Sequence, residues 1–328
     1  MSQKTALITG ISGQDGSYLA EHLLSLGYSV HGLVRRNSVP EHQVSRIDGI
    51  SKHIQTHYAD LLDPIGITRI IKITKPDEVY NLGAQSHVRI SFDIPKFTAA
   101  VNAVGALEVL EILRLGQPGI RFYQASSSEM FGDSVDLDGF QRETTPMHPV
   151  SPYGCAKLYA FHITRNYRKA HSVFAANGIL FNHESPRRGS NFVTSKIIKT
   201  AVEIKLGIAK ELVLGNLDSH RDWGHSRDYV KAMHMILNHE QPDDFVVATG
   251  QTRSVRDLCE LVFSQLGLNY LQFVKQDPKF LRPEELPYLR GDASKIKSLL
   301  GWSPETSFEE MVTEMVEFWS KKLRVANE

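Results

Sequence analysis

A strand, a glycine-rich turn and a helix follow one another at the start of the chain. The apolar run TALITG at 5–10 leads directly into GISGQDG at 10–16, and the segment 18–26 then has the leucine spacing of one helix face. Glycines three residues apart let the backbone turn sharply, and they leave the N–H groups of the helix start free to meet a negative charge. Gly10, Gly13 and Gly16 therefore predict the first strand–turn–helix unit of a dinucleotide-binding sheet.

Short apolar runs alternate with helix-length segments through the first half of the chain. We expect further strands at 29–34, 54–60, 78–83, 121–126 and 173–182. Strands separated in this way form parallel βαβ units. Because the crossovers of such units are right-handed, they predict an α/β fold with a doubly wound parallel (Rossmann) sheet.

The character of the sequence changes after about residue 183, where polar loops lengthen and prolines recur. We interpret this part as a smaller C-terminal α/β substrate-binding domain, with some elements returning to the main sheet. The expected division gives residues 1–182 and roughly 218–250 to the Rossmann domain. Residues 183–217 and 251–328 then form the smaller domain.

Charge and cysteine content narrow the expected partners and location. Lys plus Arg and Asp plus Glu number 37 each in 328 residues, so the formal net charge is zero and neither nucleic acid nor an anionic membrane is an expected partner. Cys155 and Cys259 are too few and too far apart for a disulfide framework or a zinc site, and His53 and His57 lack a convergent carboxylate, so no metal is expected. Without a signal peptide or a run of about 18 apolar residues, we expect a cytoplasmic protein.

The end of the second expected strand bears on which dinucleotide is bound. NAD sites carry an Asp or Glu there, whereas this chain has Arg35-Arg36 followed by Asn37-Ser38. Two guanidinium groups can bind a 2′-phosphate, although most arginine pairs are simply solvated. Their position predicts NADP. Asp60-Leu61, after the third strand, is placed to contact the adenine, and a helix-capping Asp60 is the competing interpretation.

Three polar side chains are candidates for the chemistry. Tyr153 and Lys157 are four apart, on one face of a helix that we expect to begin at Ser151-Pro152. The lysine and an oxidised nicotinamide would lower the tyrosine pKa so that the phenol can take a hydroxyl proton. Ser127, just past the end of the fifth strand, would share that proton.

Glu129 distinguishes two kinds of reaction. A simple ketone–alcohol oxidoreductase needs no carboxylate beside its serine and tyrosine, whereas removal of a carbon-bound proton next to a ketone needs a base. The alternative is a surface or capping glutamate.

Longer blocks of sequence then resemble a known family. GISGQDGSYLAEHLL, VYNLGAQSHV, YQASSSEMFG, SPYGCAKLYA, GILFNHESPRRGSNFVT, RDWGHSRDYV and VVATG are similar to the GDP-mannose 4,6-dehydratases, within the extended short-chain dehydrogenase/reductase family. The resemblance runs to about Pro304. It implies a lyase that converts a GDP-sugar to its 4-keto-6-deoxy derivative: Tyr153 and Ser127 assist oxidation at C4, Glu129 removes the C5 proton, water leaves from C6, and the stored hydride returns to C6.

The same resemblance implies two further sets of residues. Around NADP it places Gly10 to Asp15 (including Gln14 and Asp15), Arg35, Arg36, Asn37, Ser38, Asp60, Leu61, Leu82, Ala84, Ser86, Phe97, Lys157, His183 and Arg188. Around the GDP-sugar it places Ser86, Asn182, Val193, Lys196, Gly215, Arg221, Arg282 and Glu285. Basic side chains suit a diphosphate, and a carboxylate can accept hydrogen bonds from guanine.

The chain also departs from the family pattern. Ser127 stands where threonine is usual, which keeps the hydroxyl. The stretch NSVPEHQVSRIDGI after Arg36 differs in a region that helps to build the family's tetramer, so we expect a homo-oligomer without deciding between dimer and tetramer, or whether the 38–50 loop reaches a neighbouring subunit. Differences at 284–288 and at Val88-Arg89 leave a GDP-manno-heptose 4,6-dehydratase as an alternative. A redox-only nucleotide-sugar 4-epimerase, reductase or dehydrogenase, and a non-catalytic NADP-binding sensor, are the other possibilities.

Overall fold

The structure is a computed structural model, and it describes residues 3–36, 46–116, 119–281 and 283–325. Its centre is a parallel sheet of seven strands in the order β11-β6-β5-β4-β1-β2-β3. The strands are β1 (Thr5–Thr9), β2 (Ser29–Val34), β3 (Ile54–Tyr58), β4 (Glu78–Asn81), β5 (Arg121–Ser127), β6 (Ala175–Leu180) and β11 (Asp244–Val247). The α/β fold with a doubly wound parallel sheet, predicted from the alternating runs, is confirmed.

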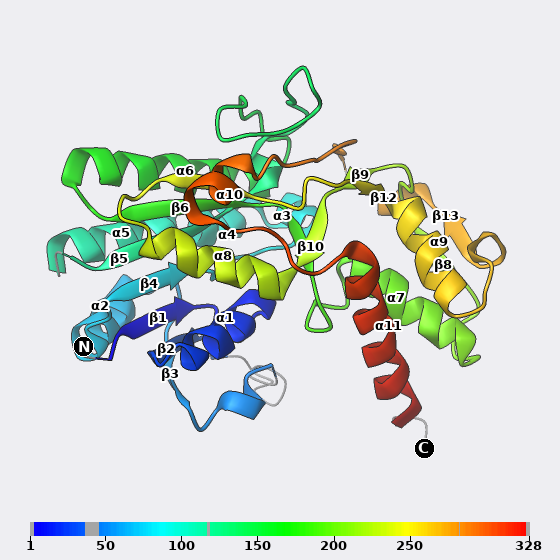
Figure 1. The fold of residues 1–328 in the computed structure, drawn as a ribbon, viewed down its shortest axis with the longest axis horizontal. Helices are drawn as coiled ribbons and strands as arrows, with labels where there is room; N and C mark the ends of the chain where they lie inside the picture. Colours follow the sequence, from blue (N-terminus) through cyan, green and yellow to red (C-terminus); the bar gives the residue numbers. More distant parts are fainter. Residues whose placement is uncertain (1–2, 37–45, 117–118, 282, 326–328) are drawn as a thin grey trace.

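Helices cover both faces of this sheet (Figure 1). One layer contains α1 (Gln14–Ser25) and α8 (Ser226–Asn238), and the other contains α2 (Pro64–Thr74), α5 (Gly105–Gly116) and α6 (Pro152–His171). Each layer buries its own apolar cluster against the strands, as expected where a parallel sheet is covered on both sides.

The order of the strands reverses beside β1. After β3 the chain crosses back to β4, which pairs with β1 on the side opposite β2. In open α/β sheets ligands bind at such a reversal, beyond the carboxyl ends of the strands. The glycine-rich turn after β1 and the segment after β4 therefore meet at the expected place for a bound dinucleotide.

The predicted sixth strand, 173–182, is divided in the structure. It leaves the main sheet after Leu180, and β7 (Asn182–Glu184) pairs instead with β10 (Trp223–His225). The predicted helix at 18–26 begins earlier, at Gln14, because Gly13 is its N-cap and Gly16 lies in its first turn. Several elements were not predicted, namely α3 (Val88–Asp93), α4 (Pro95–Ala99), the π-helix η3 (Ala100–Val104), η2 (Asp48–Ile50) and η4 (Ser128–Met130).

The C-terminal part forms a second, smaller region with its own core (Figure 1, right). Its helices are α7 (Val193–Lys205), α9 (Val255–Gln265) and α11 (Phe308–Val325), joined by the pairs β8 (Leu212–Leu214) with β13 (Val274–Gln276) and β9 (His220–Arg221) with β12 (Arg253–Ser254), and by the short turns η5 (Tyr270–Gln272) and η6 (Pro278–Phe280). Before α11, α10 (Ser294–Leu300) returns to β11, and its Ile296 packs into the core of the main sheet. Among the described helices none is long and apolar enough to cross a membrane.

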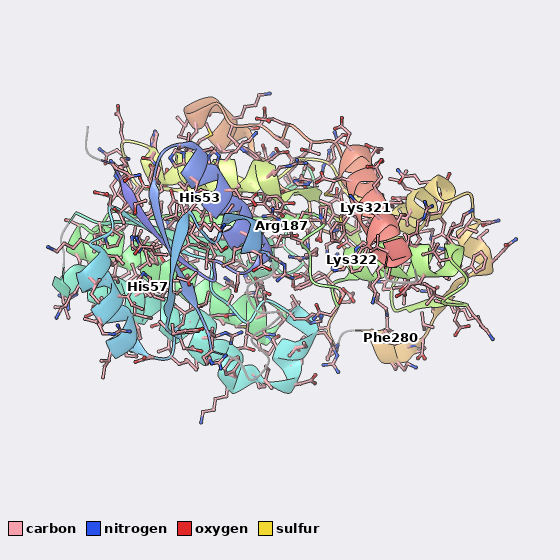
Figure 2. The ribbon with its side chains drawn as sticks, turned by 90° about the horizontal axis from the view of Figure 1, so that it is seen from below. His53, His57, Arg187, Phe280, Lys321 and Lys322 are labelled. Atoms are coloured by element: carbon pink, nitrogen blue, oxygen red, sulfur yellow. The ribbon has the colours of Figure 1, made fainter. Side chains whose placement is uncertain are left out.

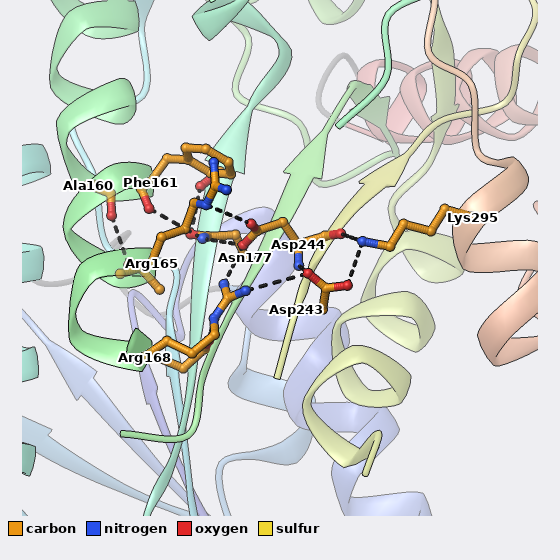
Figure 3. A network of polar contacts seen from close by, with 11 residues as sticks. Ala160, Phe161, Arg165, Arg168, Asn177, Asp243, Asp244 and Lys295 are labelled. Carbon is orange, nitrogen blue, oxygen red and sulfur yellow. Dashed lines mark hydrogen bonds and ion pairs between the residues drawn. The ribbon is translucent and has the colours of Figure 1, made fainter. Parts of the chain in front are cut away.

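A buried polar network fixes α6 to the edge of the sheet (Figure 3). Asn177 Nδ2 donates to Asp244 Oδ1 at 2.7 Å, and Arg168 of α6 pairs with the same carboxylate. Lys295 of α10 binds the neighbouring Asp243 at 2.6 Å. Because α6 also carries Tyr153 and Lys157, this network holds the helix that presents both side chains.

Candidate active site

Two glycines of the turn after β1 leave no room for a Cβ atom. Gly10 has a φ of +70°, and a Cβ there would lie 2.9 Å from Gly83 Cα, in the turn after β4. A Cβ at Gly16 would lie 2.3 Å from the Gly10 carbonyl oxygen. The turn therefore packs backbone against backbone and offers the start of α1 as a surface for a charged group.

A cavity of about 360 Å³ and another of about 510 Å³ lie beyond the carboxyl ends of the strands and share one wall. The larger, which we call the glycine-turn cavity, contains most residues expected at the cofactor. They are Gly10, Gly13, Gln14, Asp15, Gly16, Arg35, Asp60, Leu61, Leu82, Ala84, Ser86 and Arg188. Neither cavity is lined by Arg36 or Phe97, and Asn37 and Ser38 lie outside the described residues.

Four arginines line the glycine-turn cavity, and two of them were not expected there. Arg46 donates to the Ser12 carbonyl at 3.2 Å and to the Arg187 carbonyl at 2.8 Å. Arg187 lies beside α1 (Figure 2), stacks on the Tyr18 ring and pairs with Glu21 at 2.6 Å. Burial, and then the neighbouring Arg187 and Arg188, lower the pKa of Arg46. This wall of the cavity is therefore positively charged.

The smaller cavity, which we call the tyrosine cavity, brings together the residues expected to do the chemistry and to hold the sugar nucleotide. It is lined by Ser86, Ser127, Glu129, Tyr153, Lys157, Asn182, His183, Val193, Lys196, Gly215, Arg221 and Glu285. Arg282 lies outside the described residues. Asn191, Phe192, Asn216, Ser219 and Phe280 also line it and were not expected.

Helix α6 begins as predicted, at Ser151-Pro152. Ser151 Oγ accepts from Gly154 N at 3.0 Å, and Ser91 Oγ of α3 accepts from Tyr153 N at 3.2 Å. These bonds satisfy two of the free N–H groups at the helix start. They also join the turn that carries Tyr153 to α3, where Val88 and Arg89 line the same cavity.

The lysine and the tyrosine lie side by side in a buried part of the tyrosine cavity. Lys157 Nζ donates to the Ala125 carbonyl at 2.8 Å and lies 5.8 Å from the centroid of the Tyr153 ring. Burial lowers the pKa of Lys157 to about 8, although Asp15 opposes this shift. Such a lysine keeps its proton near neutral pH while remaining close to losing it.

The expected lowering of the Tyr153 pKa is not produced by the chain alone. Burial raises the pKa of Tyr153 to about 12, and the nearby Glu129 charge adds to the rise. A hydrogen bond with the Ser127 side chain opposes both. In this site the phenol is therefore protonated at neutral pH, because desolvation outweighs the help from its neighbours.

Asp15 and His183 connect the glycine turn to β7. His183 Nε2 lies 2.8 Å from Asp15 Oδ2, and its Nδ1 bonds to the Phe181 carbonyl at 2.7 Å. Burial opposes the charge on either group, but each stabilises the other, so the pKa of His183 is raised and the pKa of Asp15 is lowered. The contact therefore favours the charged form of both groups.

The far end of the tyrosine cavity also contains opposite charges. Arg221 Nη2 lies 3.2 Å from Glu285 Oε1, and its Nη1 donates to the Leu286 carbonyl at 2.8 Å. Lys196 Nζ donates to the Val213 carbonyl at 2.7 Å and lies 4.3 Å from the centroid of the Phe280 ring (Figure 2). Among the described residues, no group of three or more His, Cys, Asp or Glu side chains is placed to hold a metal ion.

Known proteins match almost the whole chain. A family model described as GDP-mannose 4,6 dehydratase matches residues 7–315. GDP-mannose 4,6 dehydratase 2 of Arabidopsis thaliana is 50% identical over 96% of this chain and 86% of its own length. GDP-mannose 4,6 dehydratase of Cricetulus griseus is 47% identical over 96% of this chain and 91% of its own length.

Solved structures share the fold at lower identity. UDP-glucose 4-epimerase of Thermotoga maritima with UDP-glucose has a TM-score of 0.85 at 24% identity, covering 97% of this chain and 99% of that one. dTDP-glucose 4,6-dehydratase of Bacillus anthracis, in complex with NAD, has a TM-score of 0.84 at 21% identity, covering 98% of both chains. From the sequence matches, the chain belongs to the GDP-mannose 4,6-dehydratase family, as its resemblance predicted.

Proposed function

We propose that this enzyme converts GDP-mannose to its 4-keto-6-deoxy derivative by internal hydride transfer through NADP. The observation that carries the proposal is a buried carboxylate beside a buried phenol and hydroxyl. Glu129, Tyr153 and Ser127 each expose less than a tenth of their surface and line one cavity. A redox-only enzyme needs the tyrosine and the serine but has no use for the glutamate.

The glycine-turn cavity fits a dinucleotide. Its glycine-rich turn suits a diphosphate, and its arginines suit a phosphate better than they suit a bare ribose hydroxyl. Arg35 directly follows β2, where a 2′-phosphate would lie, and this supports NADP over NAD. When bound there, NADP supplies an acceptor for the C4 hydride and a donor that returns it to C6.

The residues of the tyrosine cavity then divide the proton transfers. Tyr153 takes the proton of the C4 hydroxyl as the C4–H bond is oxidised, and Ser127 shares that proton through its hydrogen bond to the phenol. The resulting 4-ketone acidifies C5–H. Glu129 removes this proton and passes it to the C6 hydroxyl, which leaves as water. C5 then takes up the proton that Tyr153 gained, as the hydride returns to C6. Lys157, held on the Ala125 carbonyl, keeps a positive charge near the developing phenolate.

The sugar nucleotide would extend from these residues toward the smaller region. Lys196 and Arg221 can neutralise its diphosphate, and Glu285 can accept hydrogen bonds from guanine. Asn182 and Val193 line the path between the two ends.

The test is incubation with GDP-mannose and, separately, with GDP-manno-heptose, each carrying deuterium at C4. We expect mass spectrometry to show loss of one water from GDP-mannose without added reductant, with the deuterium retained at C6. Loss of water from the heptose alone would transfer the proposal to the heptose enzyme. Unchanged substrate mass with both would contradict a dehydratase, and release of the label into solvent would contradict internal transfer.

A further inference from the structure

The loop between β7 and α7 forms part of the wall shared by the two cavities. Arg188 and Phe192, both in this loop, line the glycine-turn cavity and the tyrosine cavity alike. The Arg188 guanidinium lies over the Phe192 ring, 3.7 Å from its centroid. A planar cation thus lies at the junction of the two cavities.

A buried carboxylate, that of Glu184, holds the Arg188 guanidinium. Glu184, at the end of β7, is 1% exposed, and its Oε2 lies 3.0 Å from Arg188 Nε. The two groups form an ion pair, in which the Nε–H is not aligned for a hydrogen bond. Thr194 Oγ1 donates to the same Oε2 at 2.6 Å, so the carboxylate cannot rotate freely. Burial raises the pKa of Glu184, while Arg188 and Thr194 oppose the rise.

The terminal nitrogens of Arg188 are left for another partner. Within the described part of the chain they form no hydrogen bond, and Asp15, the other nearby carboxylate, is held by His183 at 2.8 Å. Since the glycine turn lines the same cavity, an anion bound there would meet both the helix N–H groups and these nitrogens.

We infer that Glu184 is a positioning residue, which holds Arg188 in the orientation that binds the diphosphate of the cofactor. The inference rests on the proposed function, because it takes the occupant of the glycine-turn cavity to be NADP. Glu184 itself has no direct contact with the cofactor in this arrangement. The effect of Glu184 on cofactor binding is then expected to pass through Arg188. This expectation distinguishes positioning of Arg188 from general support of the fold.

A double-mutant cycle measured by NADPH fluorescence titration tests this, because it reads binding and not turnover. We expect Glu184→Gln to weaken NADPH binding about tenfold, as when a partner that orients a ligand-binding side chain is lost. Arg188→Ala should weaken it at least as much, and the double variant should equal Arg188→Ala alone. Glu203→Gln is the matched control, since Glu203 forms an ion pair of the same spacing with Lys199 on α7, away from both cavities.

Each result has one meaning. Unchanged binding in Glu184→Gln, or losses that add in the double variant, would overturn the inference while leaving the proposed function in place. Unchanged binding in Arg188→Ala would overturn the inference and also remove Arg188 from the proposed cofactor site. Thermal unfolding of each variant shows whether the binding loss follows Arg188 or simply lowered stability; a loss that tracks the melting temperature across all variants would also overturn the inference.

Discussion

His183 Nε2 and Asp15 Oδ2 lie 2.8 Å apart and join the first turn of α1 to the strand that leads into the smaller region. The two groups come from chain positions 168 residues apart. Their contact therefore forms only when the main sheet and β7 are both in place, and it makes the stability of this junction depend on pH.

The pH dependence follows from the directions of the two shifts. The pKa of His183 is raised above 6.5, so its contribution is complete below 6.5 and is lost as pH rises through the folded value. The pKa of Asp15 is lowered below 3.8, so its contribution is complete above 3.8 and is lost as pH falls through the folded value. We expect His183→Asn to reduce the free energy of unfolding by about 2 kcal/mol between pH 3.8 and pH 6.5, and by less at pH 9. Urea unfolding within that range and at pH 9 checks this. The exposed His53→Asn is the control (Figure 2).

Replacing Glu129 should separate oxidation from elimination. In Glu129→Gln we expect dehydration to fall by about 10²–10⁴-fold, because the base for the C5 proton is gone, while C4 oxidation persists. Reduced cofactor should then accumulate, visible by its absorbance, without loss of water from the sugar. Glu240→Gln, at an exposed position, should behave as the unaltered enzyme. Normal dehydration by Glu129→Gln would remove the residue from the mechanism.

The phenol of Tyr153 should titrate differently with oxidised and reduced cofactor. Its pKa is raised to about 12 by burial, and a bound positive nicotinamide would favour the phenolate. We expect tyrosinate absorbance to appear at lower pH with NADP⁺ than with NADPH, and the difference to vanish in Tyr153→Phe. Identical titrations with both cofactors would mean that another group takes the hydroxyl proton.

Gly154 sets the distance between Tyr153 on α6 and Glu129 on η4. A Cβ there would lie 2.8 Å from the Glu129 carbonyl oxygen and 2.9 Å from Pro149 Cβ, so Gly154→Ala must push α6 away from η4. We expect about 1–3 kcal/mol of lost stability and a larger fall in kcat than in cofactor affinity. Gly49→Ala, with open space around its Cβ, should change neither quantity. Normal kcat in Gly154→Ala would show that the spacing tolerates adjustment.

Arg35 should govern the choice between NADP and NAD. Its guanidinium is exposed at the edge of the glycine-turn cavity, and a charge-assisted hydrogen bond to phosphate contributes about 1.5 kcal/mol. We therefore expect Arg35→Met to weaken NADP binding roughly tenfold and to leave NAD binding nearly unchanged. Arg324→Met, on the exposed face of α11, is the control. An equal loss for both cofactors would place the 2′-phosphate elsewhere.

The main sheet could be predicted because its strands are apolar and are separated by helix-length segments. The limits of β2 agree with the prediction to the residue, while the strand predicted at 173–182 is longer than β6. Its apolar pattern continues through Phe181, so only the pairing of β7 with β10 reveals that the chain leaves the sheet there. Strands of two or three residues carry too little periodicity to be found without their partners.

Most lining residues could be identified through blocks of sequence that resemble a family. Arg46 and Ser91 could not, because their roles depend on contacts with distant backbone, at Arg187 and Tyr153. Glu184 lay inside one of the quoted blocks, yet nothing in its spacing distinguishes it from a surface glutamate. Its burial and its contact with Arg188 appear only in three dimensions.

Arg188 and Phe192 line both cavities, so the two cavities adjoin each other. A dinucleotide in the glycine-turn cavity would form part of the surface on which the sugar rests. Such an arrangement favours an ordered sequence, in which the nicotinamide partner enters first and cannot depart while a sugar covers it. An enzyme built in this way keeps its reduced cofactor through a whole turnover, because the escape route is closed by the molecule being transformed.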